Sequence, residues 1–72
     1  MQPEKLVMMA NQIARFFAAQ GEKRAVPQIA DHIAKFWDPR MRSNLMAHVE
    51  QGGVGLSPLT LAALAKLKPR SL

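Results

Sequence analysis

The chain has no cysteine among its 72 residues and few acidic side chains, with five Asp and Glu against ten Lys and Arg. Without cysteine it can form no disulfide and can offer no thiolate to zinc or to an iron–sulfur cluster. The longest uncharged run, 51–65, contains three glycines and a proline, and it is shorter than the about 20 apolar residues that cross a bilayer. The N-terminus lacks the pattern of a secretory signal. We therefore expect a cytoplasmic protein with no membrane span.

The length and composition indicate one small globular domain over residues 1–72. The chain is 49% hydrophobic and 21% charged, which is in the globular range. A domain of this size has a small core, so docking on a partner can supply a sizeable share of its stability. The formal net charge of +5 permits acidic partners, nucleic acid among them, without selecting one.

The first two helices are predicted from apolar residues at helical spacing. The first covers about 3 to 20 and ends before Gly21, with Asn11 and Arg15 opposite an apolar arc of Leu6, Met9, Ala10, Ile13, Phe16 and Phe17. Residues 21–24 are expected to be a charged connection, and Pro27 is expected in the first turn of the second helix. That helix ends near Trp37, and its apolar stripe is Ile29, Ile33, Phe36 and Trp37.

The next two helices begin with a capping residue followed by proline. Asp38-Pro39 starts a third helix that ends at Gly52-Gly53 and carries Met41, Leu45 and Val49 on one stripe. Ser57-Pro58 repeats the signal for a fourth helix over about 58–67, which Pro69 terminates, and a basic tail follows at about 68–72. No segment alternates with the period of a strand. The predicted fold is all-α, a small compact bundle of about four short helices.

Few residues are candidates for chemistry. His32 and His48 are the only histidines, too few for a metal site without converging acids. The glycines at 52–55 lack the order of a phosphate-binding loop, and Ser57 is better explained as a helix cap than as a nucleophile. Because no nucleophile, base and orienting group can be assembled, we predict no catalytic, cofactor-binding or metal-binding residue and no independent enzyme.

The segment 35–42 is the most informative. It reads Lys-Phe-Trp-Asp-Pro-Arg-Met-Arg and places the only Trp beside two Arg at a corner between helices. Trp and Arg are enriched among the anchors of protein interfaces. For Phe36 we favour packing in the core, and for Trp37 core and interface both remain open. Our predicted partner contacts are Phe36, Trp37, Asp38, Pro39, Arg40, Met41, Arg42 and Leu59.

Leu59 is included because the fourth helix is apolar around most of its circumference, which is typical of a helix buried on more than one side. Little of a short chain is left to cover the second side, so we expect another protein to cover it.

A competing interpretation is DNA binding, with Arg40, Arg42 and Asn44 entering a groove. It is less favoured because the linking turn is only Asp38-Pro39 and the other cations are scattered.

The sequence resembles a known family in five blocks spread over about residues 6–67. They are Met9-Ala10-Asn11-Gln12-Ile13, Phe16-Phe17, Ile29-Ala30-Asp31-His32, the block from Lys35 to Arg42, and Gly55-Leu56-Ser57-Pro58-Leu59. Together they look like the delta subunit of cytoplasmic NAD-dependent molybdenum formate dehydrogenases. The 35–42 block is the specific part of this resemblance.

The resemblance implies a non-catalytic accessory subunit of an enzyme that oxidises formate and passes electrons to NAD. The chain would dock on the large catalytic subunit and support its assembly, stability or maturation. It would bind no cofactor itself, because the molybdenum cofactor, the iron–sulfur clusters and FMN would sit in partner subunits. A transient maturation chaperone for cofactor insertion is the alternative within the same family.

Overall fold

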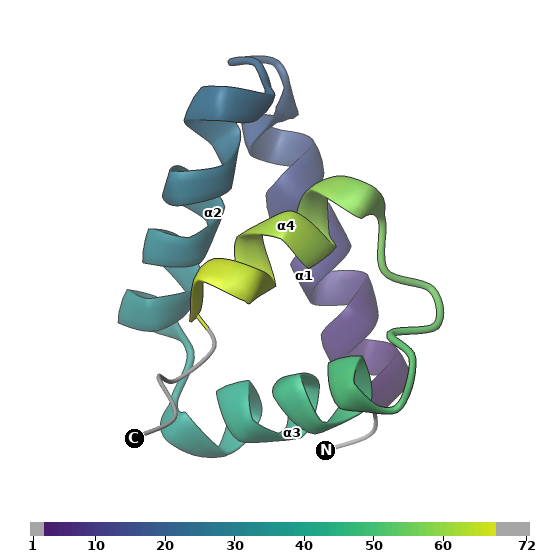
Figure 1. Ribbon diagram of the computed structural model, residues 1–72. Helices are drawn as coiled ribbons and strands as arrows, with labels where there is room; N and C mark the ends of the chain where they lie inside the picture. Colours follow the sequence, from purple (N-terminus) through teal and green to yellow (C-terminus); the bar gives the residue numbers. More distant parts are fainter. Residues whose placement is uncertain (1–2, 68–72) are drawn as a thin grey trace.

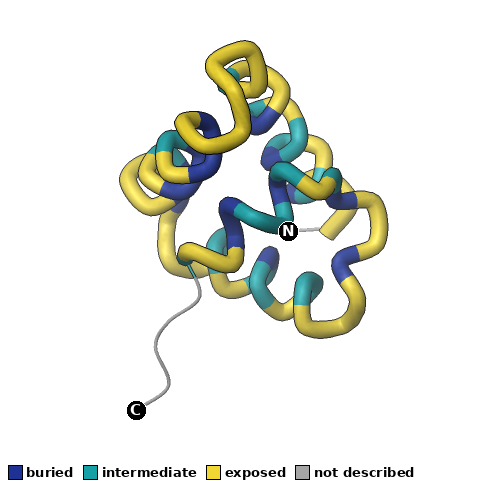
Figure 2. Tube along the Cα trace, turned by 45° about the horizontal axis from the view of Figure 1, so that its top comes forward, coloured by how far each residue is buried: buried dark blue, intermediate teal, exposed yellow. Residues whose placement is uncertain are grey.

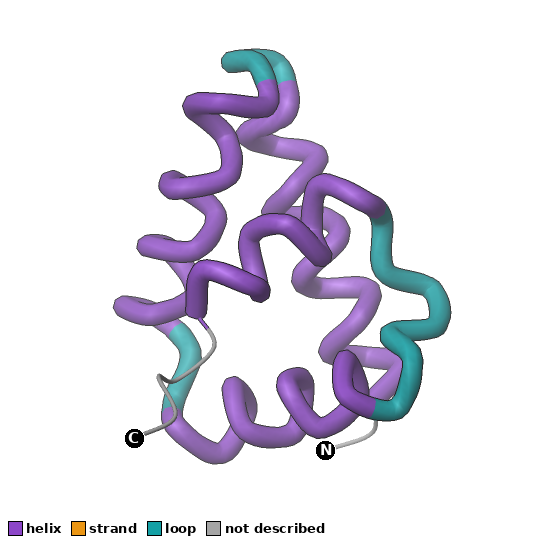
Figure 3. Tube along the Cα trace, in the orientation of Figure 1, coloured by secondary structure: helices purple, strands orange, loops and turns teal. Residues whose placement is uncertain are grey.

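The computed structural model describes residues 3–67. The predicted basic tail and the helix stop at Pro69 lie outside the described residues. Within the described range the chain forms four helices and no strand (Figure 3), namely α1 (Pro3–Ala18), α2 (Glu22–Phe36), α3 (Pro39–Glu50) and α4 (Pro58–Leu67). The predicted all-α class and small bundle are confirmed.

The helices α1 and α2 lie side by side and antiparallel, joined by a tight turn (Figure 1). The helix α3 crosses the other end of this pair and packs on α1, whereas α4 packs on both α2 and α1. Each helix turns its buried residues towards this shared interior (Figure 2). The fold is therefore a helical hairpin that α3 closes at one end and α4 covers on one flank.

The turn between α1 and α2 differs from the prediction. Gly21 has a φ of 89°, and its carbonyl oxygen accepts from the backbone N–H groups of Arg24 at 3.2 Å and Ala25 at 2.8 Å. These bonds start α2 at Glu22, so residues 21–24 are not a separate connection and Pro27 lies inside the helix. Proline lacks the N–H that would reach the carbonyl of Lys23. The helix tolerates this near its start because both residues are exposed to water.

The predicted signals at the two ends of α3 are confirmed. At its start, the Asp38 carboxylate accepts from the backbone N–H of Met41 at 2.8 Å, and Pro39 occupies the first helical position. At its end, the N–H of Gly53 bonds to the carbonyl of His48 and that of Gly52 to the carbonyl of Val49, each at 3.0 Å. This is the double closure of a Schellman motif, and it requires a positive φ at the residue after the C-cap, which is Gly52.

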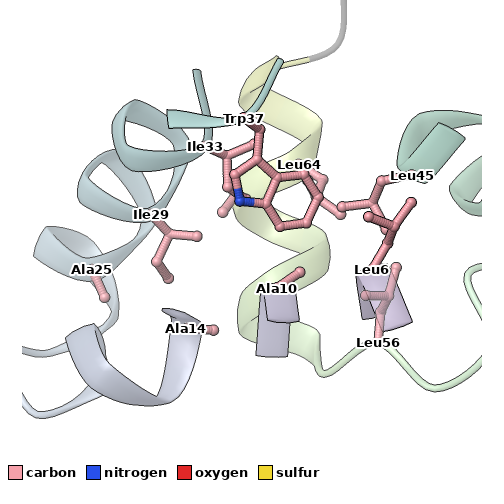
Figure 4. Close-up of a cluster of buried hydrophobic side chains, with 11 residues drawn as sticks. Leu6, Ala10, Ala14, Ala25, Ile29, Ile33, Trp37, Leu45, Leu56 and Leu64 are labelled. Carbon is pink, nitrogen blue, oxygen red and sulfur yellow. The ribbon is translucent and has the colours of Figure 1, made fainter. Parts of the chain in front are cut away.

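The core contains side chains from all four helices and the α3–α4 loop (Figure 4). Its largest fully buried side chains are Leu6, Ile29, Ile33, Leu45, Thr60 and Leu64. Three more residues of α4, Leu59, Leu61 and Leu67, pack against this core while partly exposed. The chain itself thus covers part of α4, because α4 lies on two helices at once and Leu61 also faces Gly53. The expectation that another protein covers the rest of α4 stays a prediction.

Candidate partner-binding site

The two adjacent aromatic residues at the end of α2 have opposite environments. Phe36 is 72% exposed, so the expectation that it packs in the core is wrong, whereas Trp37 is 5% exposed and belongs to the core. The helix ends at Phe36, and Trp37 takes an extended backbone with φ −93° and ψ 136°. This change of direction turns the indole in among Ile33, Leu45 and Leu64 (Figure 4). In this fold Trp37 stabilises the corner and presents almost no surface to a partner.

Arg42 also acts inside the chain. Its Nη1 donates to the carbonyl of Ala34 at 2.7 Å and to that of Trp37 at 3.1 Å. These carbonyls belong to the end of α2, where unpaired acceptors carry the negative end of the helix dipole. The half-buried guanidinium therefore caps α2 and fixes its angle to α3.

The other residues of the α2–α3 corner differ in how much of their surface faces solvent. Pro39 and Arg40 are exposed on the first turn of α3, and Phe36 is exposed at the end of α2. Met41 is half-buried and packs against the core, and the Asp38 carboxylate is engaged as the cap of α3. The corner thus exposes the ring of Phe36 and the guanidinium of Arg40. Its backbone is fixed by the Asp38 cap of α3 and the Arg42 cap of α2.

The structure does not place Leu59 with the corner. Leu59 lines a small depression against α1, together with Asn11, Ala14, Arg15, Ala18 and Ser57. The corner lies at the other end of α4, where Pro39 and Arg42 border a wider groove of about 840 Å³. The groove is mostly apolar, and its other lining residues are Ile33, Ala34, Ser43, Leu45, Met46, Ala47, Glu50, Leu64 and Leu67. The predicted contacts therefore fall into two separate places.

Asn11 is the polar residue that the sequence analysis misplaced on the solvent side. Its Nδ2 donates to the carbonyl of Gly55 at 2.8 Å, and its Oδ1 accepts from the N–H of Ser57 at 3.1 Å and from Oγ1 of Thr60 at 2.9 Å. Since the Thr60 hydroxyl gives its one hydrogen to Asn11, the Ser57 hydroxyl donates to Thr60, 2.7 Å away. Oγ of Ser57 also accepts from the N–H of Thr60 at 3.2 Å, as its predicted capping role requires.

This network joins two of the sequence blocks that carry the resemblance, residues 9–13 on α1 and residues 55–59 at the start of α4. The sequence did contain a sign of this role. Asn has a low helix propensity, so its presence in the interior of a helix made of good helix formers suggests that its side chain has a hydrogen-bond partner.

Metal binding and membrane insertion find no support in the described residues. Over residues 3–67, no group of three or more His, Asp or Glu side chains is placed to hold a metal ion. The same part of the chain contains no helix with the length and apolar character of a membrane span. Nε2 of His48 lies 2.8 Å from the carbonyl oxygen of Val54, and His32 lies between two phenylalanine rings.

A family model described as the NADH-dependent formate dehydrogenase delta subunit, FdsD, matches residues 5–64. The chain belongs to this family. The match covers most of the chain, including the α2–α3 corner and the Asn11 network, and it confirms the resemblance inferred from the sequence blocks. No curated protein and no solved structure matches the chain. The family description makes this chain an accessory subunit of a multi-subunit formate dehydrogenase.

Proposed function

We propose that this delta subunit is non-catalytic and docks on the large molybdenum-containing subunit of the NAD-dependent enzyme, supporting its assembly, stability or maturation. The molybdenum cofactor, the iron–sulfur clusters and FMN then belong to the partner subunits. The observation that carries the proposal is the construction of the corner. The buried Trp37 and the hydrogen-bonded Arg42 fix its backbone, while Phe36 and Arg40 are exposed to solvent.

A corner built in this way is suited to binding because its shape is set before the partner arrives. Association costs free energy when loops and long side chains must be ordered. Here the backbone of residues 36–42 is fixed by a cap on each helix, so little ordering remains. Binding to one conformation of the large subunit would stabilise that conformation by mass action and leave the chemistry to the large subunit.

The test is co-expression of the tagged large subunit with and without this chain, followed by native mass spectrometry of the active complex. We expect the delta subunit at fixed stoichiometry and a higher thermal midpoint of the large subunit when it is present. Purification of a fully active, equally stable enzyme that never retains the chain would overturn the proposal. Its presence only on cofactor-free enzyme would replace the stable subunit with the transient chaperone.

The nucleic-acid alternative is weakened by the structure. Arg42 is engaged at the end of α2, so α3 would enter a groove with Arg40 as the one exposed cation of its first two turns. Titration with duplex DNA at two salt concentrations checks this directly, because phosphate binding gives a steep salt dependence. We expect no binding near physiological salt.

A further inference from the structure

Four ring-bearing side chains form a continuous exposed row on the flank of the α1–α2 pair, which we name the aromatic ridge: Phe16, Phe17, His32 and Phe36. The rings of Phe16 and Phe17 meet edge to face with centroids 5.1 Å apart. Phe17 meets His32 at 6.1 Å, and His32 meets Phe36 at 4.7 Å. The two ends of the ridge are the most exposed, since Phe16 is 77% and Phe36 72% accessible.

The ridge lies away from α4 and is continuous with the corner. Phe16 follows Asn11 by five residues, so the two side chains point about 140° apart around α1, and Asn11 is the residue that faces the start of α4. Phe36, at the other end of the ridge, is also the exposed ring of the α2–α3 corner. The ridge therefore extends the docking element of the proposed function from the end of α2 to the last turn of α1.

Ring contacts link the ridge across the two helices. Phe17 packs against the core while partly exposed, and it holds Phe16 on one side and His32 on the other through ring contacts. A single exposed phenylalanine is ordinary on a protein surface. A linked row of rings across two helices is different, because it offers a large apolar area whose side chains lose little freedom on binding.

The charges beside the ridge indicate what covers it. Two exposed cations lie close in sequence to Phe36, namely Lys35 before it and Arg40 on the first turn of α3. Arg15 precedes Phe16 but lines the depression against Leu59 on the α4 flank. The acid nearest in sequence, Asp31, is taken up by Lys35 in an exposed ion pair at 3.1 Å, and such a pair exchanges easily with another carboxylate. A second copy of this chain would bring two cationic rims together at a net charge of +5 each, which opposes self-association.

We propose that the aromatic ridge inserts into an apolar cleft rimmed by carboxylates on the large catalytic subunit. This proposal rests on the proposed function and names the contact surface for it. Phe16 and Phe36 are the anchors, His32 and Phe17 support them, and Lys35 and Arg40 meet the acidic rim. The corner residue Arg40 then lies at one end of the contact.

The apolar part is tested by measuring the affinity of purified delta subunit for the large subunit. In the variant carrying Phe16→Ala and Phe36→Ala we expect at least a tenfold loss of affinity. The matched control carries Met8→Ala and Val54→Ala, which removes two equally exposed apolar side chains, 60% and 76% accessible, outside the ridge. The control should bind as the wild type does. Fluorescence of the buried Trp37 and helical circular dichroism should be unchanged in both variants, which keeps folding separate from binding.

The charged part is tested by reversal. Lys35→Glu with Arg40→Glu should weaken binding several-fold at low salt and less at high salt, because added salt screens the rim. Lys23→Glu is the control, since nine residues separate Lys23 from His32 and place it about half a turn away on α2. An equal loss in the Lys23→Glu control would contradict the acidic rim.

The outcomes separate the two proposals. If the wild-type chain binds the large subunit and the ridge variant binds equally well, the ridge inference fails and the proposed function stands. If the wild-type chain does not bind the large subunit at all, the proposed function fails and the ridge inference with it. Dimers of the isolated chain in sedimentation, abolished by the ridge variant, would assign the surface to a second copy and overturn the inference.

Discussion

The two flanks of the α1–α2 pair differ in how they are covered. On one flank, α4 and the loop before it lie on Asn11 and the core, and Thr60 is completely buried and fully hydrogen-bonded. On the other flank the aromatic ridge remains bare, with Phe16 and Phe36 mostly in solvent. One flank of the two helices is therefore covered by α4, whereas the other flank is largely exposed to solvent.

We infer from this difference that the covered flank stabilises the fold and the bare flank binds the partner. Among the described residues, every fully buried side-chain nitrogen or oxygen has a hydrogen-bond partner. The hydrogen bonds of the covered flank therefore favour one arrangement of α4, and breaking them lowers the free energy of unfolding. The bare flank contributes little to the folding of the isolated chain because its rings stay exposed. Substitutions on the covered flank should lower the free energy of unfolding, and substitutions on the bare flank should lower affinity for the partner.

The largest expected effect is at Trp37. Removing the indole by Trp37→Ala leaves a cavity in the core and should lower the free energy of unfolding by about 3 to 5 kcal/mol. A domain of 72 residues is usually stable by roughly 4 to 11 kcal/mol, so this variant should be largely unfolded at moderate urea. Urea titration followed by circular dichroism measures the loss. The neighbour Phe36→Ala is the control, and an equal loss there would remove the contrast between the two residues.

The next effect is at Asn11. Asn11→Ala leaves the hydroxyl of the buried Thr60 and the half-buried Ser57 N–H without their acceptor, and unmet buried groups cost about 1 to 3 kcal/mol. Thermal unfolding should show a lower midpoint, and hydrogen exchange at the start of α4 should be faster. Gln12→Ala, which changes the exposed neighbour, should leave both measurements unchanged. Slow exchange retained in Asn11→Ala would show that packing alone holds α4 in place.

A smaller effect is expected at Arg42. Arg42→Ala removes the cap on the end of α2 and should cost about 1.5 kcal/mol, the low end of the range for hydrogen bonds with a charged group, because one of its two bonds is exposed. Arg40→Ala in the same corner is the matched control and should change stability by less than about 0.5 kcal/mol, as exposed positions do. If the two arginines prove equivalent in chemical denaturation, the division of the corner into inner and outer residues is wrong.

The smallest stability effect is expected on the bare flank. Phe16→Ala should change the free energy of unfolding by less than about 0.5 kcal/mol, because the ring is mostly exposed in the isolated chain. The same substitution should lower affinity for the large subunit. A pronounced fall in the unfolding midpoint would mean that the ridge supports the fold, and the separation between the two flanks would no longer hold.

Local chemistry made much of the fold predictable. The caps at Asp38 and Ser57, and the glycines that end α1 and α3, are decided by neighbouring backbone groups that lie within a few residues. Helical spacing likewise identified the fold class and most core positions. The start of α2 was missed because Gly21 begins the helix before Pro27, a choice that the proline signal by itself did not reveal.

The candidate site was predicted less well, because exposure is decided by distant parts of the chain. Phe36 and Trp37 are neighbours of similar character, and only the change of backbone direction after α2 buries one and leaves the other in water. Arg42 and Arg40 look equivalent in the sequence, yet only Arg42 reaches the carbonyls at the end of α2. The ridge was likewise invisible as a unit, since its rings come from two helices.

The sequence by itself determined that this protein is all-α, where its helices are capped and which family it resembles, because these depend on residue identities and short spacings. Tertiary structure alone decided which apolar side chains are left uncovered. The physical reason is that α4 can lie on only one flank of the α1–α2 pair, held there by Asn11, so Phe16 and Phe36 on the other flank stay mostly exposed.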